Sequence, residues 1–203
     1  MTKKNPDIKP SRGFIAELYD YIEIFVFSTI AVIMLFTCGV RLCRVSGASM
    51  EQTLYDGQAL IVSNLFYKPT QGDIVVFHQT SDIYDRFNEP VVKRVIAMEK
   101  QWISIDKKTQ TVTIYDENME NPKILDESAY RYLDSGAWTV PFAMDLETPV
   151  QVPKGCIFVM GDNRNNSGDS STHPAIGFVD VRRVLGHAVL RIRPLTMFSS
   201  PQD

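Results

Sequence analysis

The chain has 203 residues, 44% of them hydrophobic and 22% charged, and a formal net charge of -3 at pH 7. A chain of this length fits one main domain with a core of its own, and its ordinary composition indicates neither a disordered chain nor a membrane protein with many spans. The slightly acidic balance implies no basic surface across a whole domain, so nucleic acid is not an expected partner.

An apolar run follows a basic N-terminal segment. The segment holds four basic residues: Lys3, Lys4, Lys9 and Arg12. The run at 24–40 carries no charge, and counting on through Arg41 to Cys43 brings it near the roughly 20 residues that a bilayer core requires. We therefore expect a transmembrane anchor at 22–43 after a cytoplasmic or interfacial segment at 1–21. The positive-inside rule favours a single-pass protein of the cell membrane with a cytoplasmic N-terminus.

Two other interpretations of the run stay open, a buried core helix and a cleaved signal peptide. Against cleavage, the residues that directly follow the run, Arg41 to Val45, are bulky or charged. The sequence Ser46-Gly47-Ala48 has the small residues of a cleavage site, but it lies beyond two arginines. We therefore expect the apolar segment to remain part of the chain and not to be cleaved off.

The remainder of the chain, at 44–203, is predicted to be mostly β and to lie outside the cytoplasm. Short runs rich in Val and Ile alternate there with turn-forming residues. Strands are expected at 59–63, 73–77, 91–98, 102–105, 111–115, 157–160 and 185–192. Asp106 to Lys108 predicts a hairpin turn, and the variable stretch at about 106–153 predicts an irregular insertion or a small subdomain. The expected fold is a mostly β domain of antiparallel, coiled or barrel-like sheets after a single N-terminal transmembrane helix.

The cysteines and histidines suggest no metal and no cofactor. The three cysteines are Cys38, Cys43 and Cys156, and the three histidines are His78, His173 and His187. None of them forms a pair or cluster with the spacing of a disulfide framework or a metal site.

A first candidate for chemistry is Ser49, which stands among small residues just after the proposed anchor. Its neighbours Gly47 and Ala48 would let a substrate backbone approach closely. Taken alone, the same residues equally describe a turn before a strand.

A second candidate is Lys93, which interrupts a run that otherwise indicates a buried strand. Alternation places it on one face with Val91 and Val95, where an ammonium group is poorly solvated. Burial can lower a lysine pKa by roughly 3 to 5 units, and only a neutral amine can take a proton from a serine. An exposed edge strand protected by Lys93 or Arg94 is the alternative, and alternation alone does not decide between them.

The third element is the loop GDNRNNSGDSS at 161–171, which follows an apolar strand. Nearly all its residues form turns or hydrogen bonds, so a tightly bonded loop is expected. Asp162, Arg164 and Asp169 can pair among themselves or with Arg94, and Ser167 could orient a neutral lysine. The loop could instead simply brace the sheet.

Together these segments resemble the type I signal peptidases, in a Gram-positive-like form. The anchor, the SxM element at Ser49, the GDIVVF strand at 72–77, the KRV element at Lys93 and the loop at 161–171 follow the family's order. The resemblance implies a serine endopeptidase in which Ser49 attacks, Lys93 is the general base and Ser167 positions the lysine. The Ser49 N–H would hold the oxyanion, without the hydroxyl that some members carry at the position of Gly47.

The resemblance also implies a substrate and partners. The substrates would be the signal peptides of exported preproteins, bound as an added strand next to membrane lipid and cut after small residues of the Ala-x-Ala type. Six residues would bind them: Val45, Gly47, Met50, Leu54, Val91 and Val92.

Three departures from the family pattern stand beside the resemblance. Gln52 replaces a usual proline, 97–100 replaces a turn with Gly and Pro, and Ser171 replaces a usual arginine that pairs with Asp169. The candidates to take over that arginine's place are Arg164, Arg182 and Arg183.

Two rival functions remain. The departures would also suit a degenerate homologue that only binds an extended partner segment at the membrane. A soluble, self-cleaving regulator uses a similar Ser-Lys pair, but it would need a DNA-binding segment where the apolar run stands.

Overall fold

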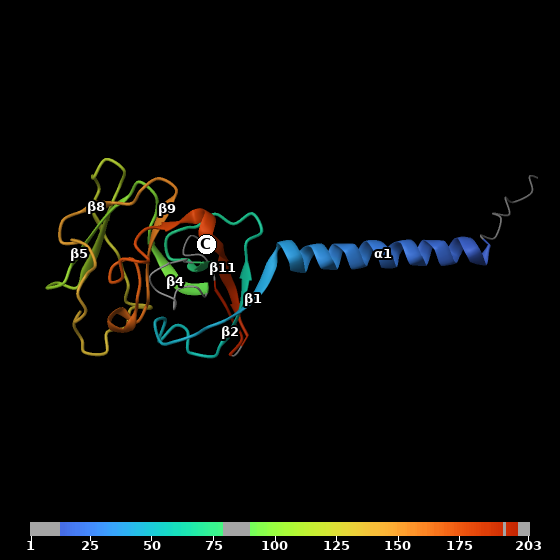
Figure 1. Ribbon diagram of the computed structural model, residues 1–203, viewed down its shortest axis with the longest axis horizontal. Coiled ribbons are helices and arrows are strands. Elements are labelled where there is room, and N and C mark those ends of the chain that lie inside the picture. The colour runs from blue at the N-terminus through green and yellow to red at the C-terminus, as the bar shows by residue number, and fades with distance from the viewer. Residues whose placement is uncertain (1–12, 79–89, 193, 199–203) are drawn as a thin grey trace, which may run out of the picture. The chain divides into compact units, whose positions relative to one another are not determined.

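The computed structural model describes residues 13–78, 90–192 and 194–198 (Figure 1). The chain forms two compact units, Met1–Gly39 and Val40–Asp203. The basic residues of the first twelve positions, on which the orientation at the membrane was predicted, lie outside the described residues.

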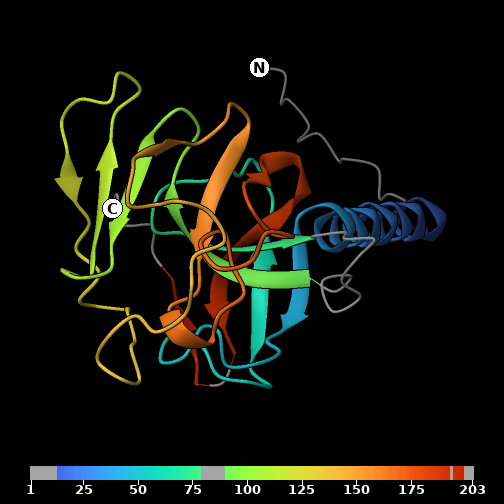
Figure 2. The same cartoon turned by 60° about the vertical axis from the view of Figure 1, so that its left-hand side comes forward.

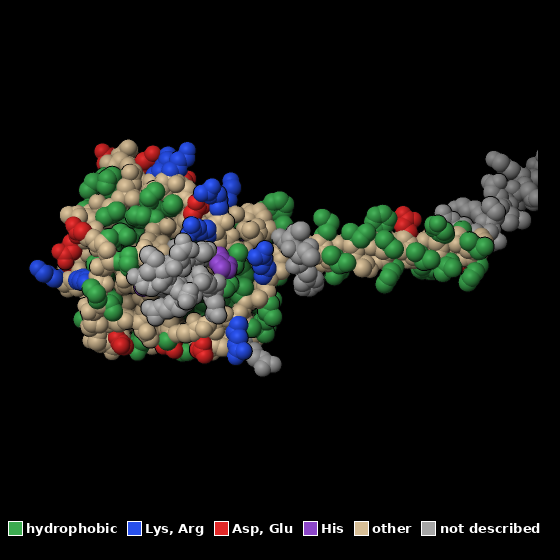
Figure 3. All heavy atoms as spheres, in the orientation of Figure 1, with side chains coloured by type: hydrophobic (Ala, Val, Ile, Leu, Met, Phe, Trp, Pro, Cys, Tyr) green, Lys and Arg blue, Asp and Glu red, His purple; other side chains and the backbone are tan. Residues whose placement is uncertain are grey.

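The first unit contains one helix, α1 (Phe14–Cys38). No Pro or Gly interrupts it, and Glu17 in its first turn suits the positive end of the helix dipole. The hydroxyls of Ser28 and Thr29 donate to the carbonyl of Phe25, so these polar groups are satisfied within the helix. Exposed apolar side chains are spread along the helix (Figure 3). Among the residues that the structure describes, no helix is both long and apolar enough to cross a membrane.

The end of the predicted apolar helix needs a correction. The chain leaves the helix at Cys38, and Val40–Arg44 forms strand β1 of the second unit. Arg41 and Cys43 pair with Val62 and Leu60 in an antiparallel ladder, so they do not extend the helix. The physical reason is that this short segment satisfies its backbone groups in the sheet.

The second unit is built on a larger and a smaller sheet. The larger sheet has the order β1-β2-β11-β3-β4-β9-β10, with β12 paired to β11. Its further strands are β2 (Ala59–Ser63), β3 (Ile74–His78), β4 (Pro90–Ala97), β9 (Cys156–Met160), β10 (Val179–Asp180), β11 (Val184–Arg191) and β12 (Thr196–Met197). Every pairing described in it is antiparallel.

The smaller sheet arises mostly from the predicted insertion. It has the order β7-β6-β5-β8 and stands at the left of Figure 2. Its strands are β5 (Trp102–Asp106), β6 (Thr111–Tyr115), β7 (Lys123–Ile124) and β8 (Val150–Gln151). The strands β5 and β6 form the hairpin that was predicted around Asp106 to Lys108, and the stretch is a small subdomain with its own sheet.

The predicted fold class is confirmed: a mostly β, antiparallel domain follows one N-terminal helix. Strands β2 and β6 have the predicted bounds, and the other five predicted strands differ from theirs by one residue at one or both ends. The strands β1, β7, β8, β10 and β12 were not predicted. Four of these are only two residues long, which is too short for an alternating pattern to show.

Three apolar clusters form the core of the second unit. One lies between the sheets, where Ile103 and Val112 of the smaller sheet belong to the same cluster as Ile96 and Phe158 of the larger one. A second cluster joins the segment after β1 to the larger sheet through Val45, Met50, Leu54, Leu60 and Val76. This second cluster fixes the segment that carries Ser49.

Candidate active site

Ser49 lies on a loop between β1 and β2 whose apolar residues are buried on both sides of it. Met50 is almost fully buried, and its carbonyl accepts from the N–H groups of Thr53 and Leu54. On the other side, Gly47 has a φ of 84°, which favours glycine, and its N–H donates to the Asp56 carboxylate over 2.8 Å. The serine is thus presented from a loop that the core holds in place.

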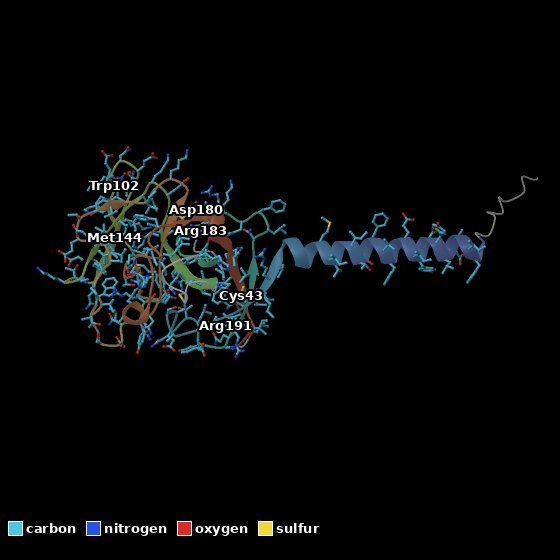
Figure 4. The ribbon with its side chains drawn as sticks, viewed as in Figure 1. Cys43, Trp102, Met144, Asp180, Arg183 and Arg191 are labelled. Atoms are coloured by element: carbon cyan, nitrogen blue, oxygen red, sulfur yellow. The ribbon has the colours of Figure 1, made fainter. Side chains whose placement is uncertain are left out.

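The far end of this loop is tied to the sheet by a charged side chain. Arg191, at the end of β11 (Figure 4), donates from Nη1 to the carbonyl of Thr53 over 2.8 Å. This charge-assisted bond satisfies a carbonyl that no strand pairing covers.

Lys93 lies in the middle of the larger sheet and faces Ser49. Its strand β4 pairs with both β3 and β9, so the alternative of an exposed edge strand is wrong. The side chain is 3% exposed, and Nζ lies 2.7 Å from Ser49 Oγ and 3.0 Å from the carbonyl oxygen of Val92. The strand therefore brings a buried amine into hydrogen-bond contact with the serine hydroxyl.

The surroundings of Lys93 favour its neutral form. Burial lowers its pKa from 10.5 to about 8, while the carboxylates of Asp169 and Asp162 partly oppose this by raising it. With a pKa of about 8, roughly a tenth of the lysine is neutral at pH 7, compared with less than a thousandth of an exposed lysine. A neutral amine at this distance can accept the hydroxyl proton, and an ammonium group can donate to the same oxygen.

Arg94, the next residue on β4, has a separate structural role. Its Nε and Nη2 bind the two carboxylate oxygens of Asp162 over 2.8 and 2.7 Å, and Nη1 donates to the carbonyl of Gly72 over 2.8 Å. The guanidinium also lies 4.1 Å from the ring centre of Tyr130. This bidentate pair holds the loop at 161–171 against β4. Lys93 and Arg94 therefore differ in their partners: Lys93 contacts Ser49, and Arg94 binds Asp162.

Asp169 is satisfied by hydroxyl and backbone groups. Its Oδ2 accepts from Ser167 Oγ over 2.7 Å and from the N–H of Gly161 over 2.9 Å. Its Oδ1 accepts from the N–H and the hydroxyl of Ser171 over 3.0 and 2.6 Å. Ser171 itself therefore takes the place of the arginine that the resemblance led us to expect.

The arginines considered as substitutes have other partners. Arg164 binds Glu127, and Arg182 binds Asp180. Ser167 donates to Asp169, and its hydroxyl makes no hydrogen bond to Lys93 in the part of the chain that is described. Among the described hydrogen bonds, Ser167 is connected to the surroundings of the lysine through the Asp169 carboxylate.

A buried ion pair joins the loop to the inserted subdomain. Arg164 and Glu127 are 0% and 1% exposed in their side chains, and both guanidinium nitrogens of the fork contact the carboxylate. Arg164 Nε also donates to the carbonyl of Gly161 over 2.9 Å. No sequence signal marked Glu127, because it stands in a polar stretch among many similar residues.

A cleft of about 530 Å³ opens beside Ser49 and Lys93. It is lined by 45–50, 90–93 and 165–168 together with Val140, Pro141, Thr172 and His173. Of the residues predicted to bind substrate, Val45, Gly47, Met50, Val91 and Val92 are among them. Leu54 is not, because it is completely buried in the core. Val140 and Pro141 come from the insertion, and no sequence signal marked them as part of the cleft.

Comparison with known proteins places this geometry in context. Residues 18–193 match the family described as signal peptidase, peptidase S26. The chain is 33% identical over 153 residues to "Probable signal peptidase I-1" of Synechocystis sp., which covers 72% of this chain and 67% of that protein. It is 35% identical over 159 residues to "Signal peptidase I" of Bacillus caldolyticus, covering 76% and 80%. It is 28% identical over 188 residues to "Signal peptidase IB" of Staphylococcus aureus, covering 88% and 93%.

The buried ion pair generates a stability prediction. We expect Glu127→Leu to lower the free energy of unfolding by about 3 to 5 kcal/mol, because it leaves the Arg164 charge buried without its partner. Chemical denaturation of the full chain in detergent measures this change. The matched control is Glu117→Gln, which removes an exposed pair with Lys100 and should cost less than about 1 kcal/mol. Equal losses in the two variants would contradict the prediction.

Proposed function

The chain belongs to the signal peptidase family, peptidase S26, and we propose that it is a membrane-bound serine endopeptidase that removes N-terminal signal peptides from exported preproteins. In this proposal Ser49 is the nucleophile and neutral Lys93 is its general base. The observation that carries it is the 2.7 Å contact between Lys93 Nζ and Ser49 Oγ at the wall of an open cleft. The lowered pKa of the lysine supports it, since a charged amine could not act as a base.

The proposed reaction has two halves. Ser49 Oγ attacks the carbonyl carbon before the scissile bond while Lys93 Nζ takes the hydroxyl proton, and the Ser49 N–H binds the oxyanion. The C–N bond then breaks, and Lys93 passes the proton to the amine of the mature protein. In the second half Lys93 takes a proton from water, the hydroxide attacks the ester, and Ser49 regains its proton as the signal peptide leaves.

The walls of the cleft support a preference for small side chains. Val45, Met50, Val91 and Val92 contribute apolar surface next to Ser49. Shallow apolar pockets favour alanine-sized residues, as in the Ala-x-Ala pattern, and an extended peptide suits a cleft beside strand β4. The degenerate-homologue rival loses part of its support, because the departure at Ser171 is accommodated by the hydroxyl network around Asp169.

We also propose that α1 attaches the chain to the membrane with the N-terminus in the cytoplasm and residues 44–203 outside. Large apolar side chains such as Phe25, Phe27 and Ile33 are mostly exposed on this helix, which is unfavourable in water. We expect the full chain to remain with membranes after extraction with alkaline carbonate. A cysteine introduced at Lys154 should react with an impermeant thiol reagent in intact cells, in a background from which Cys38, Cys43 and Cys156 are removed. Release of the chain by carbonate, or labelling only after lysis, would refute this topology.

Cleavage of a preprotein ending its signal in Ala-x-Ala tests the enzymatic proposal. We expect the wild type to cut once after the second alanine, and Ser49→Ala and Lys93→Ala to lose at least about 1,000-fold in kcat. Mass spectrometry of both products reports the site and the rate. Lys100→Ala, which changes an exposed lysine, should keep the wild-type rate. Undiminished cleavage by Ser49→Ala would exclude it as nucleophile.

The pH dependence tests the role of Lys93 separately. Because the base must be neutral, kcat/KM should rise with pH and level off above the lysine pKa of about 8. The Asp169 carboxylate raises that pKa, so Asp169→Asn should move the rise to lower pH, even if the rate at its plateau falls. Asp180→Asn removes a partly exposed carboxylate that binds Arg182 and does not shift the Lys93 pKa, so it should leave the rise in place. A profile that Asp169→Asn leaves unchanged would contradict this assignment.

A further inference from the structure

Asn163 is a buried polar residue whose side-chain amide and backbone N–H donate to the loop of Ser49. It is 4% exposed and follows Asp162, but it takes no part in the ion pairs that hold the loop at 161–171. Its side-chain Nδ2 donates to the carbonyl of Ala48 over 3.1 Å, and its backbone N–H donates to the carbonyl of Ser49 over 3.1 Å. Two successive carbonyls of the nucleophile loop are therefore held by one residue.

The first of these carbonyls belongs to the peptide unit that ends in the Ser49 N–H. The Ala48–Ser49 bond is trans, so its oxygen and its N–H point in opposite directions within one plane. The oxygen accepts from Asn163 Nδ2 and also from the N–H of Glu51 over 3.2 Å. Two donors from different parts of the chain thus fix the plane of this peptide unit.

The other end of the same peptide unit is unoccupied. Within the residues that the structure describes, the Ser49 N–H donates to no acceptor, and Ser49 lines the cleft. A backbone N–H that is free and fixed in direction suits an oxyanion that forms during attack on a substrate carbonyl. Hydrogen bonds to the carbonyl of a peptide also polarise its N–H and make it a stronger donor.

The residue two positions before Ser49 increases the importance of this alignment. Gly47 has no hydroxyl, so no side chain at that position can contribute a second donor. The oxyanion then depends more heavily on the Ser49 N–H. Any rotation of the Ala48–Ser49 peptide plane would move its main donor away from the reacting oxygen.

The amide of Asn163 is not fully satisfied by its surroundings. Its Oδ1 is buried and has no hydrogen-bond partner among the described residues. The opposite orientation would place Oδ1 against the Ala48 carbonyl and near the Glu51 carboxylate, both of which are acceptors. A buried acceptor without a partner is unfavourable for stability, so packing alone does not account for an amide at this position.

We propose that Asn163 is a positioning residue that orients the Ala48–Ser49 peptide and thereby aims the Ser49 N–H at the oxyanion. This inference rests on the proposed function, in which Ser49 is the nucleophile. This role is separate from any effect on Lys93, because Asn163 has no hydrogen bond to the lysine and is not among the groups that shift the lysine pKa.

Steady-state kinetics of Asn163→Ala on the Ala-x-Ala preprotein tests the proposal. We expect kcat to fall about 10- to 100-fold with KM within twofold of wild type, because the lost alignment matters in the transition state. The rise of kcat/KM near pH 8 should stay in place, because the surroundings of Lys93 are unchanged. Asn121→Ala, which removes an exposed amide bound to Asp116, is the matched control and should keep the wild-type kcat.

A peptide aldehyde ending in Ala-x-Ala provides a second readout. Its adduct with Ser49 places an oxygen where the oxyanion forms, so its inhibition constant should weaken in Asn163→Ala by about the same factor as kcat. The matching peptide with a methyl group in place of the aldehyde has no oxygen at that position and should bind both proteins equally. If Asn163→Ala fails to fold, Asn163→Asp carries the same expectations for kcat and the aldehyde, since it preserves the shape and replaces the donor by an acceptor.

The outcomes distinguish a failure of the proposed function from a failure of the proposed role of Asn163. A wild type that cleaves nothing overturns the proposed function and this inference with it. A wild type that cleaves, together with an Asn163 variant that keeps its kcat or loses only affinity, overturns this inference alone. If the aldehyde and the methyl-terminated peptide lose affinity for Asn163→Ala by the same factor, the cleft is distorted, which also overturns this inference.

Discussion

The burial of one lysine amine against a serine hydroxyl is the constraint on which the rest of the second unit depends. Lys93 has a pKa of about 8 in the folded chain, below its ordinary value of 10.5. Between these two pH values the unfolded chain binds a proton that the folded chain does not, so stability rises with pH across this window. At neutral pH the buried lysine therefore lowers stability. Because the lysine itself is unfavourable, other interactions must stabilise the interior strand that carries it.

Those interactions come from two carboxylates near Lys93, each of which binds groups other than the lysine. Asp162 is occupied by the bidentate contact with Arg94, and Asp169 by hydroxyl and backbone donors. A direct ion pair from either carboxylate to the lysine would raise its pKa and keep it protonated. Engaging both carboxylates elsewhere limits this effect to a partial opposition. The loop at 161–171 thus braces the sheet, while its two carboxylates oppose the neutral form of the lysine only in part.

Much of this arrangement could be predicted from the sequence, and the reasons for the failures are physical. Runs with clear alternation gave seven strands close to their observed bounds, whereas strands of two residues carry no pattern. Alternation could not distinguish Lys93 from Arg94, because both faces of an interior strand are covered. Glu127 was missed because its role arises from a tertiary contact with Arg164 far along the chain. The arginine expected opposite Asp169 is absent because a carboxylate can be satisfied by hydroxyls as well as by a cation.

The same loop connects the two halves of the proposed chemistry. Asp162 reaches Arg94 beside the lysine, and the next residue, Asn163, reaches the peptide before the serine. The backbone directly after β9 therefore contacts both the strand that carries Lys93 and the peptide unit between Ala48 and Ser49. Because adjacent residues of one tightly bonded segment hold both, a shift of this segment would displace base and donor together. The geometry of Lys93 relative to the Ser49 N–H then depends on the three residues 161–163. The first of them, Gly161, has no room for a Cβ, because it packs directly against Ser167 and the Ser49 carbonyl.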